Sequence, residues 1–329
     1  MKKQLLVLAI FVLASFANVT MSYAQGDNAL KPMAGKKYTY TISVDPTGGT
    51  YDWFVTTDVN LKTAVAIPSG SAAGDILLGG KGYNDPLSTA ATIDITWSAA
   101  AVAAANATPT PTKYYLVVKY TTTCSNNIKP WRITPINLFQ IDVEKVNSTG
   151  ALIAEDICRA AFVDAVIGAD DKVTYDYGEN ALYLKVTAKN FAGSWTPKVD
   201  IAALKGSITA PQTIKSIEWS LTTTFTETSN FDLTTGVATT VVPDKGADNV
   251  TNGIDEFVYI KVVIKDANFE GLTAQTLKLN LSATDLAGNK DVDVDAAGIA
   301  VAENDNVEQI LKARPKVTAT DPSPFLIAN

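Results

Sequence analysis

The sequence predicts an all-β protein made of two tandem β-sandwich domains. Residues 38–44 alternate apolar and polar side chains with a period of two, which is typical of a strand buried on one face. Residues 45–49 read Asp-Pro-Thr-Gly-Gly, a turn sequence, and an apolar run at 51–55 follows, so the two segments predict a hairpin. A chain of 329 residues that is 47% hydrophobic is long enough to build two cores.

Further segments of the same character continue along the chain. We expect strands at residues 92–97, 114–122, 131–143, 181–188, 213–222, 257–266 and 276–284.

Two stretches have helical features. Residues 98–107 are rich in alanine, but they are short, lack an amphipathic stripe and end in a Thr-Pro repeat. We expect a surface loop or a single helical turn there. Residues 302–312 place Val307, Ile310 and Leu311 at helical spacing before Pro315, so a short helix and a coil are both open.

The chain is expected to divide into four parts. Residues 1–24 are a signal peptide, 25–146 a first β-sandwich, 147–301 a second β-sandwich, and 302–329 a C-terminal tail. The boundary is set at the polar turn Asn-Ser-Thr-Gly, which begins at residue 147. The tail alternates apolar residues before Phe-Leu-Ile, so it is a candidate docking strand, either on its own domain or on a neighbouring copy.

The N-terminus predicts export. Lys2 and Lys3 precede an apolar stretch at 5–17, and Ser-Tyr-Ala at 22–24 reads as a cleavage site. The apolar stretch of about 13 residues is shorter than the roughly 20 needed to cross a bilayer. No later run is long enough for a membrane helix, so we expect an extracellular or cell-surface location, with the periplasm also open.

Two cysteines fit this location. In an oxidising compartment Cys124 and Cys158 are expected to form a disulfide. The alternative is two separate buried thiols.

The sequence contains no histidine, which excludes several classes of catalytic and metal site. Without imidazole there is no Ser-His-Asp or Cys-His catalytic site and no His-ligated zinc. The formal net charge of −7 argues against nucleic acid as a partner. Acid pairs at 155–156, 170–171 and 255–256 are adjacent, and neighbours on a strand point to opposite faces. We therefore predict no enzyme, no catalytic residues and no cofactor. A carboxylate-dependent glycoside hydrolase is the lesser alternative.

The alternating aspartates at 291–295 could bind a calcium ion, because alternate carboxylates can converge on one cation. The EF-hand pattern fails, because Ala296 and Ala302 stand where glycine and glutamate are required. A strand with its aspartates in water is the expected structure. The alternative is a Ca²⁺ ion between the domains, held by Asp285, Asp291 or Asp293.

The tryptophans divide into two groups. Trp53, Trp97 and Trp219 lie inside alternating strands and are expected in the core. Trp131 and Trp195 lie close to prolines and are the candidates for exposed rings that stack on a ligand such as a sugar.

Three segments of the first domain carry a family resemblance. GKKYTYTISVDPTGGTYDWFV at 35–55, ATIDITWS at 91–98 and KYYLVVKYTTTCS at 113–125 resemble the PKD-like, immunoglobulin-like domains of Bacteroidota secreted proteins. Later segments, including ITPINLFQIDV, are similar to a second module in exported proteins of that phylum. TDLAGN at 284–289 resembles a turn of bacterial adhesin immunoglobulin-like repeats.

The resemblance implies two immunoglobulin-like β-sandwiches without enzymatic activity. The function expected from it is a secreted or cell-surface structural or interaction protein. Such a protein would bind a protein partner or self-assemble through strand edges or its C-terminal tail. A carbohydrate-binding, adhesin-like protein is the alternative.

Overall fold

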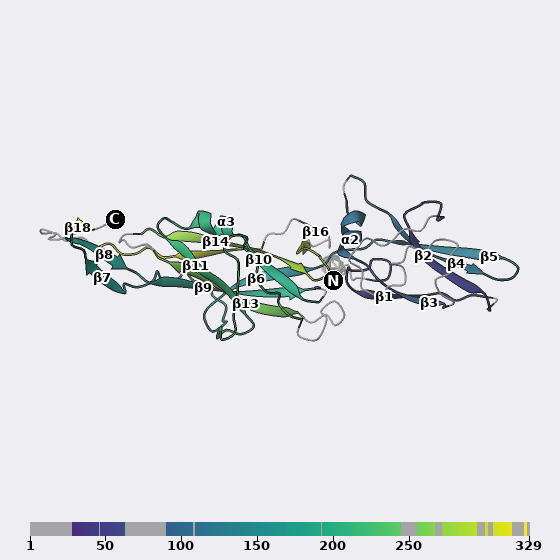
Figure 1. The fold of residues 1–329 in the computed structure, drawn as a ribbon, viewed down its shortest axis with the longest axis horizontal. Helices are drawn as coiled ribbons and strands as arrows, with labels where there is room; N and C mark the ends of the chain where they lie inside the picture. Colours follow the sequence, from purple (N-terminus) through teal and green to yellow (C-terminus); the bar gives the residue numbers. More distant parts are fainter. Residues whose placement is uncertain are drawn as a thin grey trace, which may run out of the picture.

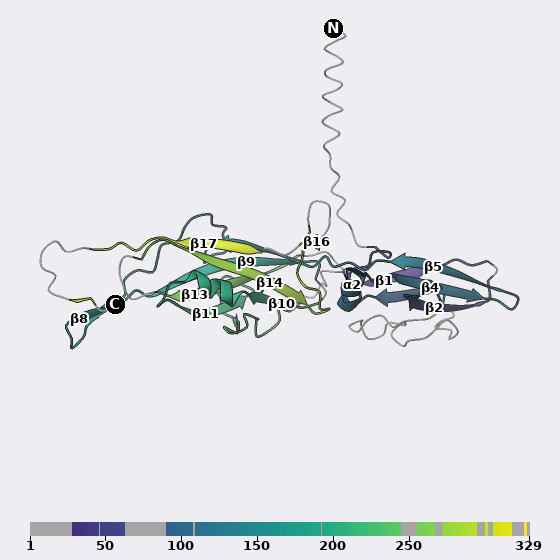
Figure 2. The ribbon, with the colours of Figure 1, turned by 90° about the horizontal axis from the view of Figure 1, so that it is seen from above.

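The computed structural model describes residues 28–45, 47–62, 90–107, 109–191, 193–244, 255–266, 272–294, 300–301, 305–317 and 326–327. The predicted signal peptide, residues 1–24, lies outside these ranges. The described chain is mostly β-structure and forms two units placed end to end, which gives the molecule a long, narrow shape (Figures 1 and 2). The all-β prediction is confirmed.

The first unit has two small sheets that face each other across a core. One sheet pairs β1 (Lys37–Thr41) with β3 (Thr92–Thr96) in antiparallel register. The other has the order β2-β4-β5, with bounds Thr50–Thr56, Tyr114–Thr121 and Asn126–Ile133. Alternate residues of these strands point inward, and the core contains Trp53, Trp97, Ile95 and Leu116.

A short helix follows β3, where we expected a loop or a single turn. Helix α2 (Ala99–Ala105) begins after Ser98, whose hydroxyl accepts a hydrogen bond from the Ala101 N–H at 3.1 Å. This N-cap and the burial of Ala101 and Val102 stabilise the helix despite its length.

The second unit is larger and contains a five-stranded and a three-stranded sheet. The five-stranded order is β12-β11-β13-β9-β6. Its bounds are Ser229–Asn230, Thr213–Ser220, Glu256–Lys265, Glu179–Lys189 and Gln140–Val146. The three-stranded order is β10-β14-β17, with bounds Trp195–Val199, Gln275–Asp285 and Asn306–Leu311. A single hydrophobic cluster lies between them, and helix α3 (Ile201–Ser207) packs on β14.

Two further strand groups lie outside these sheets. A short pair joins β15 (Asp293–Val294) and β16 (Ala300–Val301). At the far end of the second unit, a small sheet has the order β18-β8-β7, with bounds Leu326–Ile327, Lys172–Asp176 and Asp164–Ile167.

Residues 305–312, the described part of the segment 302–312, contain a strand and not a helix. In β17 the side chains of Val307, Gln309 and Leu311 are buried and their neighbours are exposed. Antiparallel pairing with β14 supplies the backbone partners that a short helix would have supplied locally. The apparent helical spacing of the apolar residues was therefore misleading.

The change of sheet comes earlier in the chain than the expected boundary at 146/147. The predicted strand at 131–143 is two strands, because β5 ends at Ile133 and β6 begins at Gln140. β6 pairs with β9 and so belongs to the second unit. The expected tail also divides: β17 completes a sheet of the second unit, and β18 pairs in parallel with β8 of its own chain.

The two units meet at a small apolar contact. Met33 is buried there against Leu138 and Ala287. Asn137 Nδ2 donates to the Lys290 carbonyl at 2.5 Å, which ties the turn after β14 to the linker between the units.

Candidate interaction site

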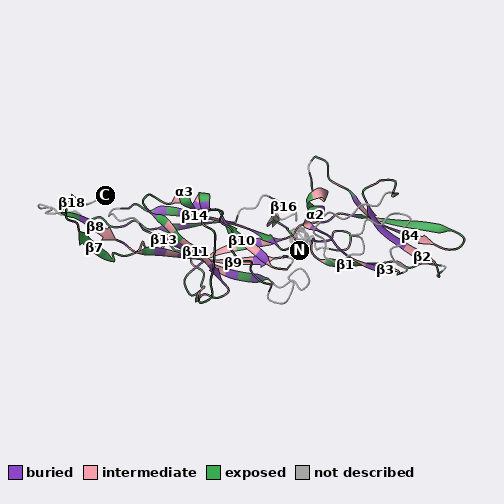
Figure 3. Cartoon of the chain, viewed as in Figure 1, coloured by how far each residue is buried: buried purple, intermediate pink, exposed green. Residues whose placement is uncertain are grey.

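A β-hairpin with exposed apolar side chains ends the second unit. β7 and β8 lie at the extremity of the molecule, away from the first unit (Figures 1 and 2). All four residues of β7 are exposed, as Figure 3 shows. Val166 is 60% exposed, Ile167 54%, and the preceding Phe162 and Val163 are 55% and 62% exposed. Exposing such an apolar patch to water is unfavourable, so the patch is a candidate contact surface.

The hairpin also presents an open strand edge. Within the described part of the chain, β7 pairs with β8 alone. The Gly168 N–H donates to the Lys172 carbonyl at 2.8 Å, so this is a hydrogen-bonded antiparallel pair. Because such pairs alternate along an antiparallel ladder, Ala165 and Ile167 direct their backbone groups away from β8.

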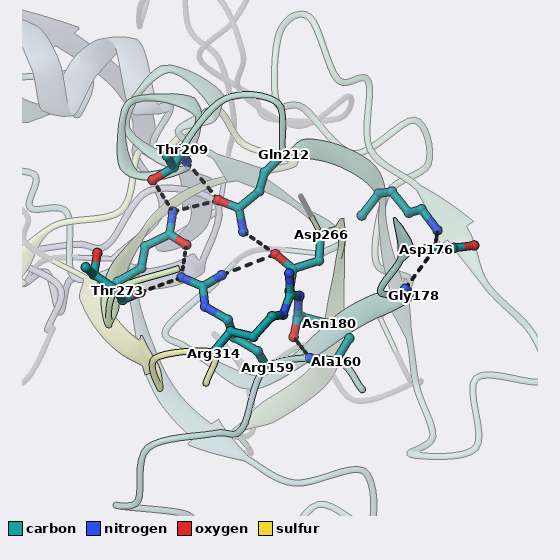
Figure 4. Close-up of polar contacts among 12 residues, drawn as sticks. Arg159, Ala160, Asp176, Gly178, Asn180, Thr209, Gln212, Asp266, Thr273 and Arg314 are labelled. Atoms are coloured by element: carbon teal, nitrogen blue, oxygen red, sulfur yellow. Dashed lines mark hydrogen bonds and ion pairs between the residues drawn. The ribbon is translucent and has the colours of Figure 1, made fainter. Parts of the chain in front are cut away.

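A buried charge cluster lies at the root of the hairpin (Figure 4). The Asp266 carboxylate accepts hydrogen bonds from Arg159 Nη1 at 3.2 Å, from Gln212 Nε2 at 2.8 Å, and from Arg314 Nη2. Arg159 Nη2 also donates to the Thr273 carbonyl at 2.9 Å. Two guanidinium groups thus share one carboxylate.

The charge cluster joins segments that are far apart in sequence. Arg159 precedes β7, Asp266 follows β13 and Arg314 follows β17. All three side chains are almost fully buried. Burial lowers the pKa of Arg159, and Asp266 opposes that shift. We interpret the cluster as a structural clamp that holds the base of the hairpin.

Aromatic rings continue from the clamp into the hairpin. The rings of Phe162, Tyr175 and Tyr177 pack together, with centroids between 5.7 and 6.3 Å apart. They line a hollow of about 510 Å³ beside Cys158 and Arg314. At the end of β8, Asp176 accepts hydrogen bonds from Lys265 Nζ at 2.6 Å and from the Gly178 N–H at 2.9 Å. These two donors hold the pKa of Asp176 below its usual value.

The expected disulfide is not present. Cys124 lies between β4 and β5 in the first unit, and Cys158 lies beside β17 in the second. Both are free and exposed, so the alternative of two buried thiols is also wrong. A disulfide needs its Cα atoms within about 7 Å, and sequence spacing alone does not supply that proximity.

The two candidate ligand-stacking tryptophans are not brought together. Trp195 is fully buried in the core of the second unit, so its assignment to an exposed site is wrong. Pro197 lies within β10, and this strand carries the Trp195 ring inward. Trp131 is half-buried and stacks on Trp53, with ring centroids 5.8 Å apart. Trp53, Trp97 and Trp219 are buried, as predicted.

Trp131 lies in a surface groove of the first unit. The groove has a volume of about 480 Å³ and also contains Ile42, Asp45, Tyr120 and Lys129. One face of the Trp131 ring is covered by Trp53, and the groove runs along the edge strand β5.

The acidic residues considered for calcium have protein partners. Asp285 accepts from the backbone N–H and the side-chain amide of Asn289, each at 2.8 Å. Asp291 is buried and accepts from the Ile141 N–H at 2.9 Å, so it does not lie in water as expected. No group of three or more candidate metal ligands occurs among the described residues. The side chain of Asp293 is outside the description, and calcium binding stays a prediction.

The sequence reasoning missed the hairpin and the clamp. Gly-Ala-Asp-Asp at 168–171 is a turn sequence and residues 172–177 alternate polar and apolar side chains, so β8 and the turn were a usable hairpin signal, whereas β7 itself does not alternate. The clamp gives no such signal, because Arg159 and Arg314 meet Asp266 only through the fold.

The described residues include no helix that is both long and apolar enough to cross a membrane.

Comparison with known proteins gives weak likenesses. No family model matches the chain, and no curated protein matches its sequence. Among solved structures, a variant of BcpA, the major pilin subunit of Bacillus cereus, is similar at 7% identity and a TM-score of 0.24. That match covers 81% of this chain and 63% of the pilin subunit.

Two further likenesses are of the same strength. The collagen-binding domain of the Erysipelothrix rhusiopathiae surface protein RspB matches at 8% identity and a TM-score of 0.20, over 86% of this chain and 85% of that domain. The full-length major pilin SpaD from Corynebacterium diphtheriae matches at 9% identity and a TM-score of 0.21, over 88% of this chain and 63% of the pilin. At these identities and TM-scores the likenesses carry no argument about the function of this chain.

Proposed function

We propose that this chain is a non-enzymatic, exported structural or interaction protein of the cell surface or the extracellular space. In this proposal its two units are tandem immunoglobulin-like sandwiches, as the resemblance to Bacteroidota PKD-like domains implies. They act as a spacer that carries a contact surface at one end.

One observation carries the proposal. An apolar, open-edged hairpin lies at the tip of a long molecule, and a buried ion cluster holds its base. A hairpin with exposed valine and isoleucine side chains costs solubility, and it gains stability when a partner covers it. A spacer that presents such a tip is suited to contact with another protein.

The location of the chain tests this proposal. Cells that produce the full chain are fractionated, and intact cells are treated with a protease that does not enter them. We expect the chain in the medium or among the proteins removed from the cell surface, while a cytoplasmic marker stays intact. A chain that remains with the cytoplasmic marker overturns the proposal.

A glycan-binding function is the second candidate, and the Trp131 groove favours it. A half-exposed indole beside Asp45 and Lys129 offers a stacking face together with polar groups for sugar hydroxyls. Affinity electrophoresis in polysaccharide gels tests it, and unchanged mobility in every gel rejects it.

A further inference from the structure

We propose that the edge of β7 pairs with β7 of a second copy of this chain. The two copies then share one mixed sheet with the strand order β18-β8-β7-β7-β8-β18, in which the new β7–β7 pair is antiparallel. This inference rests on the proposed function, because it names the partner of the same apolar hairpin.

The composition of β7 favours strand addition. β5 is an edge strand of the first unit, and it carries Lys129 and Pro130, both exposed. Charged residues and proline are the usual protection of an edge against a new strand. β7 reads Asp-Ala-Val-Ile: its one charged residue is Asp164 at its first position, and residues 165–167 include neither a charge nor a proline. Of these two edges, β7 is therefore the open one.

The backbone pattern limits the registers that the pairing can adopt, and we choose the one in which Ala165 lies opposite Ile167 of the second copy. Ala165 and Ile167 direct their N–H and C=O groups outward. In the pairing, Ala165 forms hydrogen bonds with Ile167 of the second copy, and Ile167 forms them with Ala165 of the second copy. The Ala165 N–H now donates to its neighbour Asp164 at 2.8 Å, and this local bond is replaced on pairing. The twofold axis then passes between the two copies of Val166.

Side chains support this register. Val166 lies opposite Val166 of the second copy in a non-hydrogen-bonded pair, where side chains are closest. Asp164 lies opposite Gly168 of the second copy, so no like charges meet. Shifting the axis from Val166 to Ile167 would place Asp164 against Asp170 and oppose two carboxylates.

Charge complementarity adds a second argument for a copy of the same chain. Within one chain Gly168 pairs with Lys172 across the hairpin. In the dimer Asp164 lies opposite Gly168 of the second copy, so the row continues from Asp164 through that glycine to Lys172 of the second copy, on one face of the sheet. Two strand spacings, about 10 Å, separate the backbones of Asp164 and that lysine. Gly168 has no side chain, so the long Lys172 side chain extends across it toward the carboxylate. In a single chain Lys172 has the exposed Asp170 as its ion-pair partner, at 3.5 Å.

A charge-swap experiment at Val166 tests the register. Sedimentation equilibrium is measured on the mature full chain, on Val166→Lys, on Val166→Glu and on an equimolar mixture of the two variants. We expect the wild type to dimerise and each variant alone to dimerise about tenfold or more weakly, because like charges meet on the axis. The mixture is expected to recover the dimer.

Controls separate pairing from folding. Ile128→Lys is the matched variant, because Ile128 is a 36% exposed residue on β5, an edge strand of the first unit, and it is expected to keep the wild-type dimer. At a chain concentration too low for the wild type to dimerise, thermal melting of both Val166 variants should match the wild type, since the side chain is exposed. Ile167→Pro removes an outward N–H without removing a bond to β8, and it is expected to abolish the dimer.

Each contrary result is decisive for the pairing. A monomeric wild type, an unaffected Val166→Lys dimer or a monomeric mixture overturns it. None of these results changes where the chain is found in the cell, so the proposed function is judged separately by the fractionation experiment.

Discussion

The guanidinium group of Arg314 lies over the ring of Tyr177, with its central carbon 3.6 Å from the ring centroid. The same side chain donates to the buried carboxylate of Asp266. Arg314 follows the strand β17, and Tyr177 follows β8 at the base of the hairpin. One side chain therefore connects the last large sheet of the second unit with the projecting hairpin through a cation–π contact and an ion pair.

Replacing Asp266 with asparagine should destabilise the second unit strongly. Two buried guanidinium groups would lose their shared counter-charge, and breaking a buried ion pair on one side costs about 3–5 kcal/mol. Urea unfolding of the variant measures this loss. Lys37→Gln, which removes an exposed ion pair with Asp94, is the control and should cost less than about 1 kcal/mol. Equal effects from the two substitutions would contradict the clamp.

The stability of the first unit should fall at alkaline pH because of Tyr40. Burial raises the pKa of Tyr40 from 10.0 to about 12, and its hydroxyl donates to the Ala29 carbonyl at 2.6 Å. The folded state keeps this proton between pH 10 and 12, whereas the unfolded state loses it. The contribution is therefore fully present below pH 10 and is lost as the pH rises through 12.

Chemical unfolding of wild type and Tyr40→Phe at several pH values between 9 and 12 checks this dependence. The variant is less stable at neutral pH, since it loses the bond to Ala29, but its stability should fall less steeply in the alkaline range. Parallel curves for the two proteins would show that Tyr40 does not titrate with unfolding.

The strands that could be predicted from the sequence are those that bury one face in a hydrophobic core. β9, β13 and β14 match their predicted segments to within two residues, because burial of one face imposes a period of two on the sequence. The sequences YLKVTAKNFAG at 183–193 and YIKVVIKDANFEG at 259–271 resemble each other, and they belong largely to β9 and β13, which are neighbours in one sheet. Their likeness reflects the same environment on both strands.

The features that could not be predicted depend on contacts between distant residues. β17 looked like a helix or coil because its pairing with β14 leaves no mark in its own six residues. β7 is exposed on both faces and therefore lacks the buried periodicity that marks a strand. The clamp needs Arg159, Asp266 and Arg314 to meet, and no local pattern indicates that meeting.

Both cysteines should react with a thiol reagent in the native protein. Cys124 and Cys158 are exposed and lie in different units, so neither is protected by burial or by the other. Chain purified after export without reductant is treated with Ellman's reagent under native conditions, and its mass is measured. Two adducts on the wild type and one on each single Cys→Ser variant are expected. A wild type that gains no adduct until it is reduced would restore the disulfide hypothesis.

Trp131 and Trp195, which both lie close to prolines in the sequence, should differ strongly in how much stability is lost when each is replaced with alanine. Trp195 is fully enclosed in the larger core, so Trp195→Ala should cost about 3–5 kcal/mol of stability through a cavity. Trp131 stacks with one face on Trp53 and borders the groove with the other, so Trp131→Ala should cost less. Denaturant unfolding separates the two, and a polysaccharide gel that retards the wild type should not retard Trp131→Ala. If the gel still retards Trp131→Ala, the groove is not the sugar-binding surface, because Trp131 is the only described tryptophan with a partly exposed ring along β5.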